Sequence, residues 1–221
     1  IPLGIASAIL MTAAMGVACG LVVTKGKITD FIATLGMLSI AQGLALVISN
    51  ARPVTVFSPF MSAIAGGKVG PIPVITLIAL VIAISAHFLL FHTRFGTHLF
   101  AVGGNAEGAK NMGLKVDRIK ITAFVISGIL AGIGGILLTA RIGSAEPTAG
   151  STYLLSSVAA AVLGGVSLFG GRGTILGPVV GALVLTSLLN LMTILGVGVF
   201  FQPIVTGFVV ILFAIAYRFQ Q

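Results

Sequence analysis

The chain has 221 residues, of which 57% are hydrophobic and only 7% are charged, far below the roughly 25% charged content of soluble domains. This composition excludes an ordinary soluble domain and predicts a protein that lies in a lipid bilayer. The formal net charge is +8, but the basic residues lie between apolar stretches without interleaved aromatic residues, so they indicate membrane topology before nucleic-acid binding.

Seven apolar segments of 19 to 23 residues contain no Asp, Glu, Lys or Arg. A helix needs ~20 such residues to cross the ~30 Å hydrocarbon core, so the sequence predicts an all-α, polytopic membrane protein with about seven transmembrane helices. The segments cover residues 3–24, 31–51, 71–93, 121–140, 151–169, 174–195 and 199–217.

The first apolar segment has no basic n-region and no small-residue cleavage site, so it is not a signal peptide. Cys19 is the only cysteine, and neither an internal disulfide nor a multi-cysteine metal site is expected. Because no linker, low-complexity tract or repeat interrupts the chain, residues 1–221 are expected to form a single membrane domain.

Residues 53–70, PVTVFSPFMSAIAGGKVG, separate the second and third segments. Pro53, Pro59 and a Gly-Gly-Lys sequence interrupt them. They are too short and too broken to cross the bilayer, and are expected either to lie at its interface or to re-enter it.

The stretch AVGGNAEGAKNMGLKVDRIK holds six charged residues in a chain that has only twelve basic and four acidic ones. Asn105 is expected to cap a short helix over residues 106–112, and Gly113 offers the left-handed residue that ends it. Glu107 falls in the positive first turn of this helix and Lys110 nearer its negative end.

Ala106, Ala109 and Met112 recur at a spacing that predicts one small apolar face on this short helix. A helix of about seven residues is marginal alone in water, so it must dock on its own membrane domain or on a cytoplasmic partner. Both alternatives are open from the residues alone. Asp117 is expected to cap the fourth long segment, with Arg118 and Lys120 at the lipid headgroups.

The distribution of basic residues predicts the orientation, because cytoplasmic loops carry an excess of Lys and Arg. With the loop of residues 94–120 in the cytoplasm, the C-terminus is cytoplasmic and residue 1 lies outside, which predicts that further membrane segments precede it. Nine basic residues then lie inside and three outside: Lys25, Lys27, Arg94, Lys110, Lys115, Arg118, Lys120, Arg172 and Arg218, against Arg52, Lys68 and Arg141.

Thirty glycines are present, and several stand four residues from another small residue. Such spacing lets another backbone approach one helix face closely, either within one bundle or at a subunit interface. The pairs are Gly16 with Gly20, Gly128 with Gly132, Ala131 with Gly135, and Gly177 with Gly181.

The sequence GGVSLFGGRG, residues 164–173, lacks the Lys and Ser/Thr of a phosphate-binding loop and the spacing of a dinucleotide fingerprint. It is expected to form a sharp turn between the fifth and sixth segments, with a half-length helix before it as one option. Ser156 and Ser157 precede that turn and either face a pathway or hydrogen-bond their own helix backbone.

Gln42 and Asn190 are the most deeply placed amides, and either hydrogen-bonds a transported solute or joins two helices. His87, His92 and His98 do not share one helix face, and no cysteine or nearby carboxylate completes a metal site, so a packed or interfacial role is expected.

Four runs resemble the permease subunit of ribose-type monosaccharide importers of the ATP-binding cassette class, a binding-protein-dependent transport family. They are FIATLGMLSIAQGLALVISNARPV, RFGTHLFAVGGNAEGAKNMGLKVDRIKI, SGILAGIGGILLTARIGSAEPTAG and AVLGGVSLFGGRGTILGPVVGAL. Family members also carry a GIDLSVG-type segment nearer the N-terminus, which this sequence lacks.

The resemblance implies a second permease subunit, identical or homologous, two ATPase subunits on the cytoplasmic face, and a sugar-binding protein outside, in the bacterial inner membrane. It implies that this chain is not an enzyme and carries no cofactor, since ATP is hydrolysed on another chain. The family's coupling element corresponds to Asn105, Glu107, Ala109, Lys110, Met112 and Gly113. Arg141 and Glu146 lie in an outward loop that either contacts the binding protein or is simply solvated.

The residues give less support to other classes of function. An ion-coupled carrier usually needs an ionisable residue inside the membrane, and all four carboxylates fall at segment ends or in loops. An intramembrane enzyme would need a nucleophile with its base, paired acids or metal ligands, and no such set is found. A structural scaffold would not need the loop helix, so a bulky charged residue at Ala109 is expected to abolish ATPase docking and uptake but not insertion.

Overall fold

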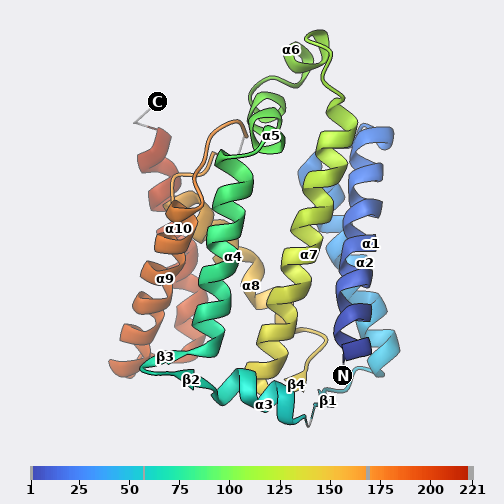
Figure 1. Cartoon of the computed structure of the whole chain (residues 1–221). Coiled ribbons are helices and arrows are strands. Elements are labelled where there is room, and N and C mark those ends of the chain that lie inside the picture. The colour runs from blue at the N-terminus through green and yellow to red at the C-terminus, as the bar shows by residue number, and fades with distance from the viewer. Residues whose placement is uncertain (1, 57, 168–169, 219–221) are drawn as a thin grey trace. The chain divides into compact units, whose positions relative to one another are not determined.

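The computed structural model describes residues 2–56, 58–167 and 170–218, and almost all of its regular structure is helical (Figure 1). The strands in these ranges are four two-residue pieces that pair two by two. The chain divides into two compact units, the first built from residues 1–81 with 109–150 and the second from residues 82–108 with 151–221.

Three long helices and one short one make up most of the first unit. They are α1 (Pro2–Gly26), α2 (Asp30–Ser49), α3 (Pro59–Gly66) and α7 (Val116–Ile142). α2 ends at Asn50 in the left-handed conformation, where the Asn50 N–H bonds the carbonyls of Leu46 and Val47, and α7 ends in the same way at Gly143, with φ of 78°.

α1 and α7 pack antiparallel through small residues. A Cβ built on Gly16 would lie 2.5 Å from the Phe124 carbonyl oxygen, and one on Gly20 would lie 2.9 Å from Ile121 Cα. Gly128 and Gly132 of α7 lie in the same way against Thr12. These two glycine pairs therefore serve packing within the chain.

The pair of Ala131 and Gly135 behaves differently. Both residues are exposed, and a Cβ on Gly135 would meet nothing within 4 Å. This pair makes no close helix contact within the described chain.

Contacts at each end of the first unit hold its long helices in register. At one end, Lys120 near the start of α7 forms a 3.6 Å ion pair with Asp30, the first residue of α2. At the other end, β1 (Val54–Thr55) pairs antiparallel with β4 (Ser144–Ala145), which joins the segments that follow α2 and α7.

The segment of residues 53–70 does not cross, as expected. The Ser58 hydroxyl caps α3 by accepting from the Met61 N–H, Pro59 occupies the first turn, and the helix packs against α7. After it, β2 (Lys68–Val69) and β3 (Ile72–Pro73) form a small hairpin. Figure 1 shows α3 lying across the end of the unit rather than along its helices, an interfacial rather than a re-entrant placement.

The second unit contains α5 (Arg94–Gly104), most of α8 (Ala149–Leu163), α9 (Leu176–Ile194), the 3-10 turn Val199–Phe201 and α10 (Gln202–Arg218). Its buried cluster is small and consists of Ala159, Ala160 and Leu185, with Leu163 and Val209 packed around them. Three helices, α4 (Val74–Phe91), α6 (Ala106–Asn111) and α8, run from one unit into the other along the chain.

Each of the seven expected spans coincides with a helix, and the protein is a polytopic helical membrane protein. Five helices are long and apolar enough to cross a bilayer among the described residues: α1, α2, α4, α7 and α9. α8 has only 15 residues, fewer than the ~20 that a crossing requires, so the fifth segment contains a shortened helix rather than the full span expected from its apolar length. α10 has 17 residues, and the number of crossings stays a prediction.

Candidate functional site

The short helix α6 forms where the loop sequence predicts it. The Asn105 N–H bonds the Ala101 carbonyl and so closes α5, while its side-chain Oδ1 accepts a 2.8 Å hydrogen bond from the Gly108 N–H and so opens α6. Glu107 lies in the first turn and Lys110 in the last. Gly113 has φ of 83°, and its N–H bonds the Lys110 carbonyl, so it ends the helix as expected.

The expected apolar face of α6 is not continuous, which corrects the sequence-based expectation. Ala109 is only 1% exposed and so is packed inside its own chain, whereas Met112 lies beyond the last helical residue and is 74% exposed. A six-residue helix makes less than two turns, so the i+6 position falls outside it. Ala106 and Asn111 are exposed, as are the longer side chains of Glu107, Lys110 and Met112.

The start of α7 also differs from the expected one. α7 begins at Val116, its N-cap position is Lys115 without a side-chain hydrogen bond, and Asp117 lies inside the first turn rather than at the cap. Asp117 still places a negative charge at the positive end of the helix. The helix therefore starts five residues before the apolar segment that predicted it, which began at residue 121.

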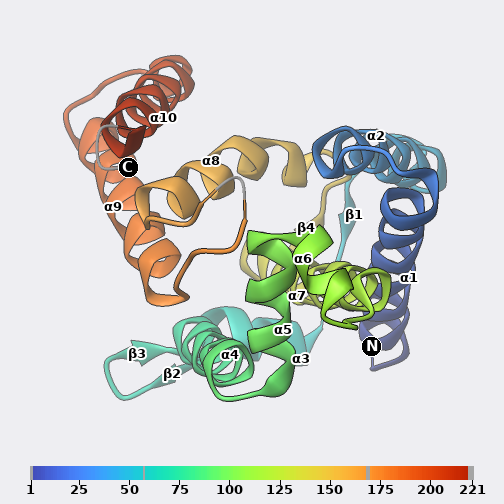
Figure 2. The same cartoon turned by 90° about the horizontal axis from the view of Figure 1, so that it is seen from above.

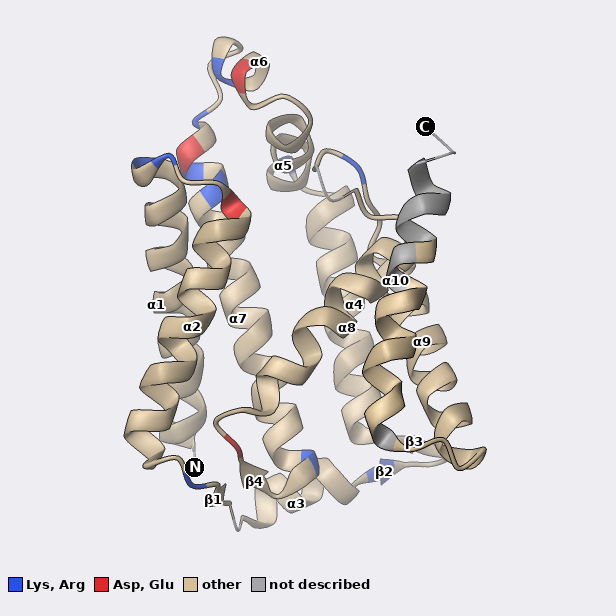
Figure 3. Ribbon diagram, turned by 180° about the vertical axis from the view of Figure 1, so that it is seen from behind, with Lys and Arg blue, Asp and Glu red and all other residues tan. Residues whose placement is uncertain are grey.

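Charge is distributed unequally between the two ends of the first unit (Figure 3). Six basic residues of this unit lie at the end where α1 finishes and α7 starts, and three lie at the other: Lys25, Lys27, Lys110, Lys115, Arg118 and Lys120, against Arg52, Lys68 and Arg141. Within this unit the bias agrees with the predicted orientation, in which α6 lies on the cytoplasmic side.

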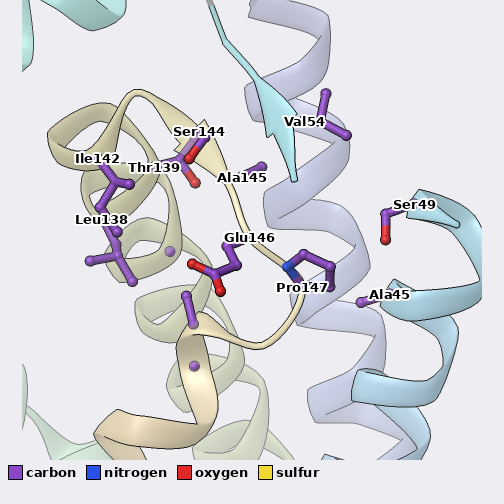
Figure 4. Close-up of a pocket in the computed structure, with 13 residues that line it drawn as sticks. Ala45, Ser49, Val54, Leu138, Thr139, Ile142, Ser144, Ala145, Glu146 and Pro147 are labelled. Carbon is purple, nitrogen blue, oxygen red and sulfur yellow. The ribbon is translucent and has the colours of Figure 1, made fainter. Parts of the chain in front are cut away.

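A cavity of about 380 Å³ opens at the less basic end of the first unit (Figure 4). It is mostly apolar, with hydroxyl groups from Ser49, Thr139 and Ser144 and the carboxylate of Glu146 among its lining groups. Glu146 Oε1 accepts a 3.2 Å hydrogen bond from the Thr148 hydroxyl. Glu146 is thus part of a shaped surface, whereas Arg141 is exposed in the last turn of α7 and is not among the lining residues.

Sequence reasoning missed the rest of this cavity. Ser49, Val54 and Thr139 come from segments about ninety positions apart that only the β1–β4 pairing brings together. Strands of two residues carry no periodicity, so no pattern in the sequence could have predicted the pairing.

The four polar residues expected in the spans belong to three helices, α2, α8 and α9. Ser157 donates a 2.9 Å hydrogen bond to the Leu154 carbonyl of its own helix, as one alternative expected, and Ser156 is half-buried beside it in α8. Gln42 in α2 is half-buried and Asn190 in α9 is exposed. Neither amide joins two helices within the described part of the chain, and the pathway role of these four residues stays a prediction.

Two of the histidines, His87 and His92, pack against phenylalanine rings. The rings of Phe88 and His92 stack with centroids 5.1 Å apart, and His87 lies 4.8 Å from Phe91. Among the described residues, no three His, Cys, Asp or Glu side chains could hold a metal ion together.

The glycine-rich turn, defined as residues 164–173, forms a tight connection between α8 and α9 in its described residues 164–167 and 170–173. Gly165, Gly170 and Gly171 all have positive φ, and the Ser167 N–H bonds the Arg172 carbonyl across the turn. Its predicted role as a sharp turn is confirmed.

Known proteins are similar in sequence to the chain that forms these features. Residues 1–215 match the family described as branched-chain amino acid transport system / permease component. The chain belongs to this permease family. The ribose import permease protein RbsC of Escherichia coli strain K12 is 38% identical over 212 residues, which cover 94% of this chain and 66% of that protein.

Two further relatives of this permease are similar to it over a comparable length. RbsC of Bacillus subtilis strain 168 is 41% identical over 198 residues, covering 87% of this chain and 61% of that protein. The D-allose transport system permease protein AlsC of Escherichia coli strain K12 is 37% identical over 204 residues, covering 92% and 62%. This permease chain therefore spans less than two thirds of the length of these relatives. No solved structure matches it.

Proposed function

We propose that this chain is the membrane-spanning permease subunit of an ATP-driven, binding-protein-dependent importer of a monosaccharide or a similar small polar solute. Membership of the permease family and the ribose and allose permeases among its relatives support the substrate class. The observation that carries the coupling role is α6, a capped helix with an exposed acidic residue, basic residue and thioether at the basic end of the first unit.

In this proposal α6 is the contact for ATPase subunits, which hydrolyse ATP on a separate chain while this chain carries no cofactor. A second permease subunit, identical or homologous, completes the pathway in the bacterial cytoplasmic membrane, with the C-terminus in the cytoplasm. An ATPase movement shifts the permease between inward-open and outward-open states only through contacts that differ between those states. The exposed ends of Glu107, Lys110 and Met112 are the groups that can make such contacts.

The test compares two exposed apolar residues at opposite ends of the first unit. Met112 is 74% exposed after α6 and Val69 is 62% exposed in the β2–β3 hairpin. Met112→Glu is expected to lower co-purification of the ATPase and solute uptake by about tenfold, whereas Val69→Glu leaves both unchanged. Equal ATPase binding by the two variants would contradict the proposal.

The buried Ala109 is not a clean site for this test. Its side chain is packed within the chain, so a bulky charged residue there would disturb the loop before it disturbed any partner. The substitution expected from the sequence to remove docking is therefore replaced by Met112→Glu.

We further propose that the cavity lined by Glu146 contacts the solute-binding protein. Its position at the end of the first unit opposite α6 supports this, because the binding protein approaches from outside in the predicted orientation. Glu146→Lys is expected to weaken binding-protein-stimulated ATP hydrolysis, while basal hydrolysis stays constant. Stimulation equal to that of the unmodified permease at every binding-protein concentration would exclude the contact.

A further inference from the structure

The glycine-rich turn packs backbone to backbone against the end of α5, within the second unit. A Cβ on Gly103 would lie 2.7 Å from the backbone nitrogen of Gly171. Reciprocally, a Cβ on Gly170 would lie 2.8 Å from the Gly103 carbonyl oxygen, and one on Gly171 would lie 2.6 Å from Gly104 Cα. Figure 2 shows the connection from α8 to α9 passing beside α5.

These separations are shorter than a methyl group tolerates, so a side chain on either surface would push the two backbones apart. Gly170 and Gly171 also have φ of 91° and 74°, which gives the turn a shape that other residues adopt only with strain. The contact therefore needs glycine on both sides because of the close approach, and at Gly170 and Gly171 also because of the positive φ.

The other side of the turn is held by the helices it connects. Gly164 and Gly177 oppose each other at the end of α8 and the start of α9, and Gly181 lies on the Ala160 carbonyl. A continuous series of backbone contacts thus runs from α9 and α8 through the turn to α5. Asn105 continues it, because this residue closes α5 with its N–H and opens α6 with its side chain.

We propose that Gly103, Gly170 and Gly171 are positioning residues that hold the coupling helix α6 to the α8–α9 pair, so that a displacement of α6 moves these two helices with it. The inference rests on the proposed coupling role of α6. Packed backbones of this kind transmit a displacement because neither surface has a side chain that could change rotamer and absorb it.

The test uses the assembled complex of permease, ATPase and binding protein in liposomes, and measures solute imported per ATP hydrolysed. Gly103→Ala is compared with Gly104→Ala, its matched control. Both residues lie in the last turn of α5, but a Cβ on Gly104 would meet nothing within 4 Å. The Gly103 variant is expected to retain the ATPase yet import about tenfold less solute per ATP, and the Gly104 variant to import normally.

A merely structural role for Gly103 would predict another result. Misfolded complexes would lower ATP hydrolysis and uptake together and leave their ratio unchanged, which would overturn the inference. Should the Gly103 variant fail to assemble, one glycine inserted between Gly104 and Asn105 loosens the same connection without adding a Cβ to the contact. A normal ratio in this second variant would also overturn the inference.

Failure of the proposed function would look different. In that case the unmodified chain would neither retain an ATPase nor import solute at the expense of ATP. The solute imported per ATP by the Gly103→Ala complex is therefore compared with that of an unmodified complex in which ATP hydrolysis drives import.

Discussion

Gly16 and Gly20 show how a missing side chain stabilises a membrane protein. Lipid tails are as apolar as leucine, so burial provides little attraction between helices, and close backbone packing provides it instead. The two glycines let α1 reach the backbone of α7 at Phe124 and Ile121. Thr12 fits the same contact because its hydroxyl bonds the Ala8 and Ile9 carbonyls of its own helix.

Gly20→Leu is therefore expected to lower the free energy of unfolding of the detergent-solubilised protein by about 1–3 kcal/mol through overpacking against α7. Thermal unfolding followed by circular dichroism measures the change. Gly36→Leu is the control, because a Cβ at Gly36 in α2 would meet nothing within 4 Å. Equal destabilisation by both substitutions would show that the α1–α7 contact is not the cause.

The side chain of Asn105 makes one hydrogen bond, which its Oδ1 accepts from the Gly108 N–H. Asn105→Ala is expected to cost about 1 kcal/mol of α6 stability, since a cap of this kind is lost. Hydrogen exchange of the amides in residues 106–111 should then quicken by about fivefold, and Asn105→Ser should restore the slow rate. Unchanged exchange in the alanine variant would mean that the tertiary contact at Ala109 alone holds the helix.

Some features of the α6 helix follow from neighbouring residues, and others depend on the tertiary structure. Its cap, its charges and its terminating glycine are all local, and each is found where the sequence indicates it. Neighbouring residues do not determine which side of the helix faces inward. Only the structure shows that Ala109 is packed while Met112 is exposed. The surface that α6 leaves open to a partner is therefore the polar side of the helix and the residue after it.

The orientation of these elements across the membrane is testable with single cysteines. In a Cys19→Ser background, Val69→Cys is expected to react with a membrane-impermeant maleimide in spheroplasts, because its hairpin lies outside in the predicted orientation. Met112→Cys is expected to react only after permeabilisation. The reverse pattern would place α6 outside and would remove the proposed coupling role.

For the protein as a unit, the absence of carboxylates from its spans bears on its energy source. Asp30 and Asp117 stand in the first turns of α2 and α7, Glu107 stands in α6 and Glu146 follows β4. Within the described chain no acidic side chain lies mid-helix where a proton relay would need it. The coupling contact proposed for α6 does not depend on such a relay.

Uptake by cells that express the complete transporter is accordingly expected to stop when ATP is depleted and the proton gradient is maintained. Uptake should persist, initially, when a protonophore collapses the gradient while ATP remains high. Transport that survives ATP depletion but ends with the gradient would instead indicate an ion-coupled carrier.

Composition and apolar run length were sufficient to predict a helical membrane protein and the approximate positions of its helices. They gave the fifth segment as a full span, and a shortened helix there was one option drawn from the glycine-rich stretch that follows it. They were sufficient because hydrocarbon leaves a backbone almost no alternative to helix. The α6 cap and the glycine-rich turn were equally predictable, because a cap and a positive φ depend on neighbouring residues only.

Tertiary structure alone decided which glycines touch which backbone, that Ala109 is buried, and that residues near 50 and near 145 line one cavity. The physical reason is that a glycine or a two-residue strand has the same local signal whether its partner lies ten or a hundred residues away. Such contacts can be identified only once the fold brings two distant backbones together, as it does for Gly103 and Gly171.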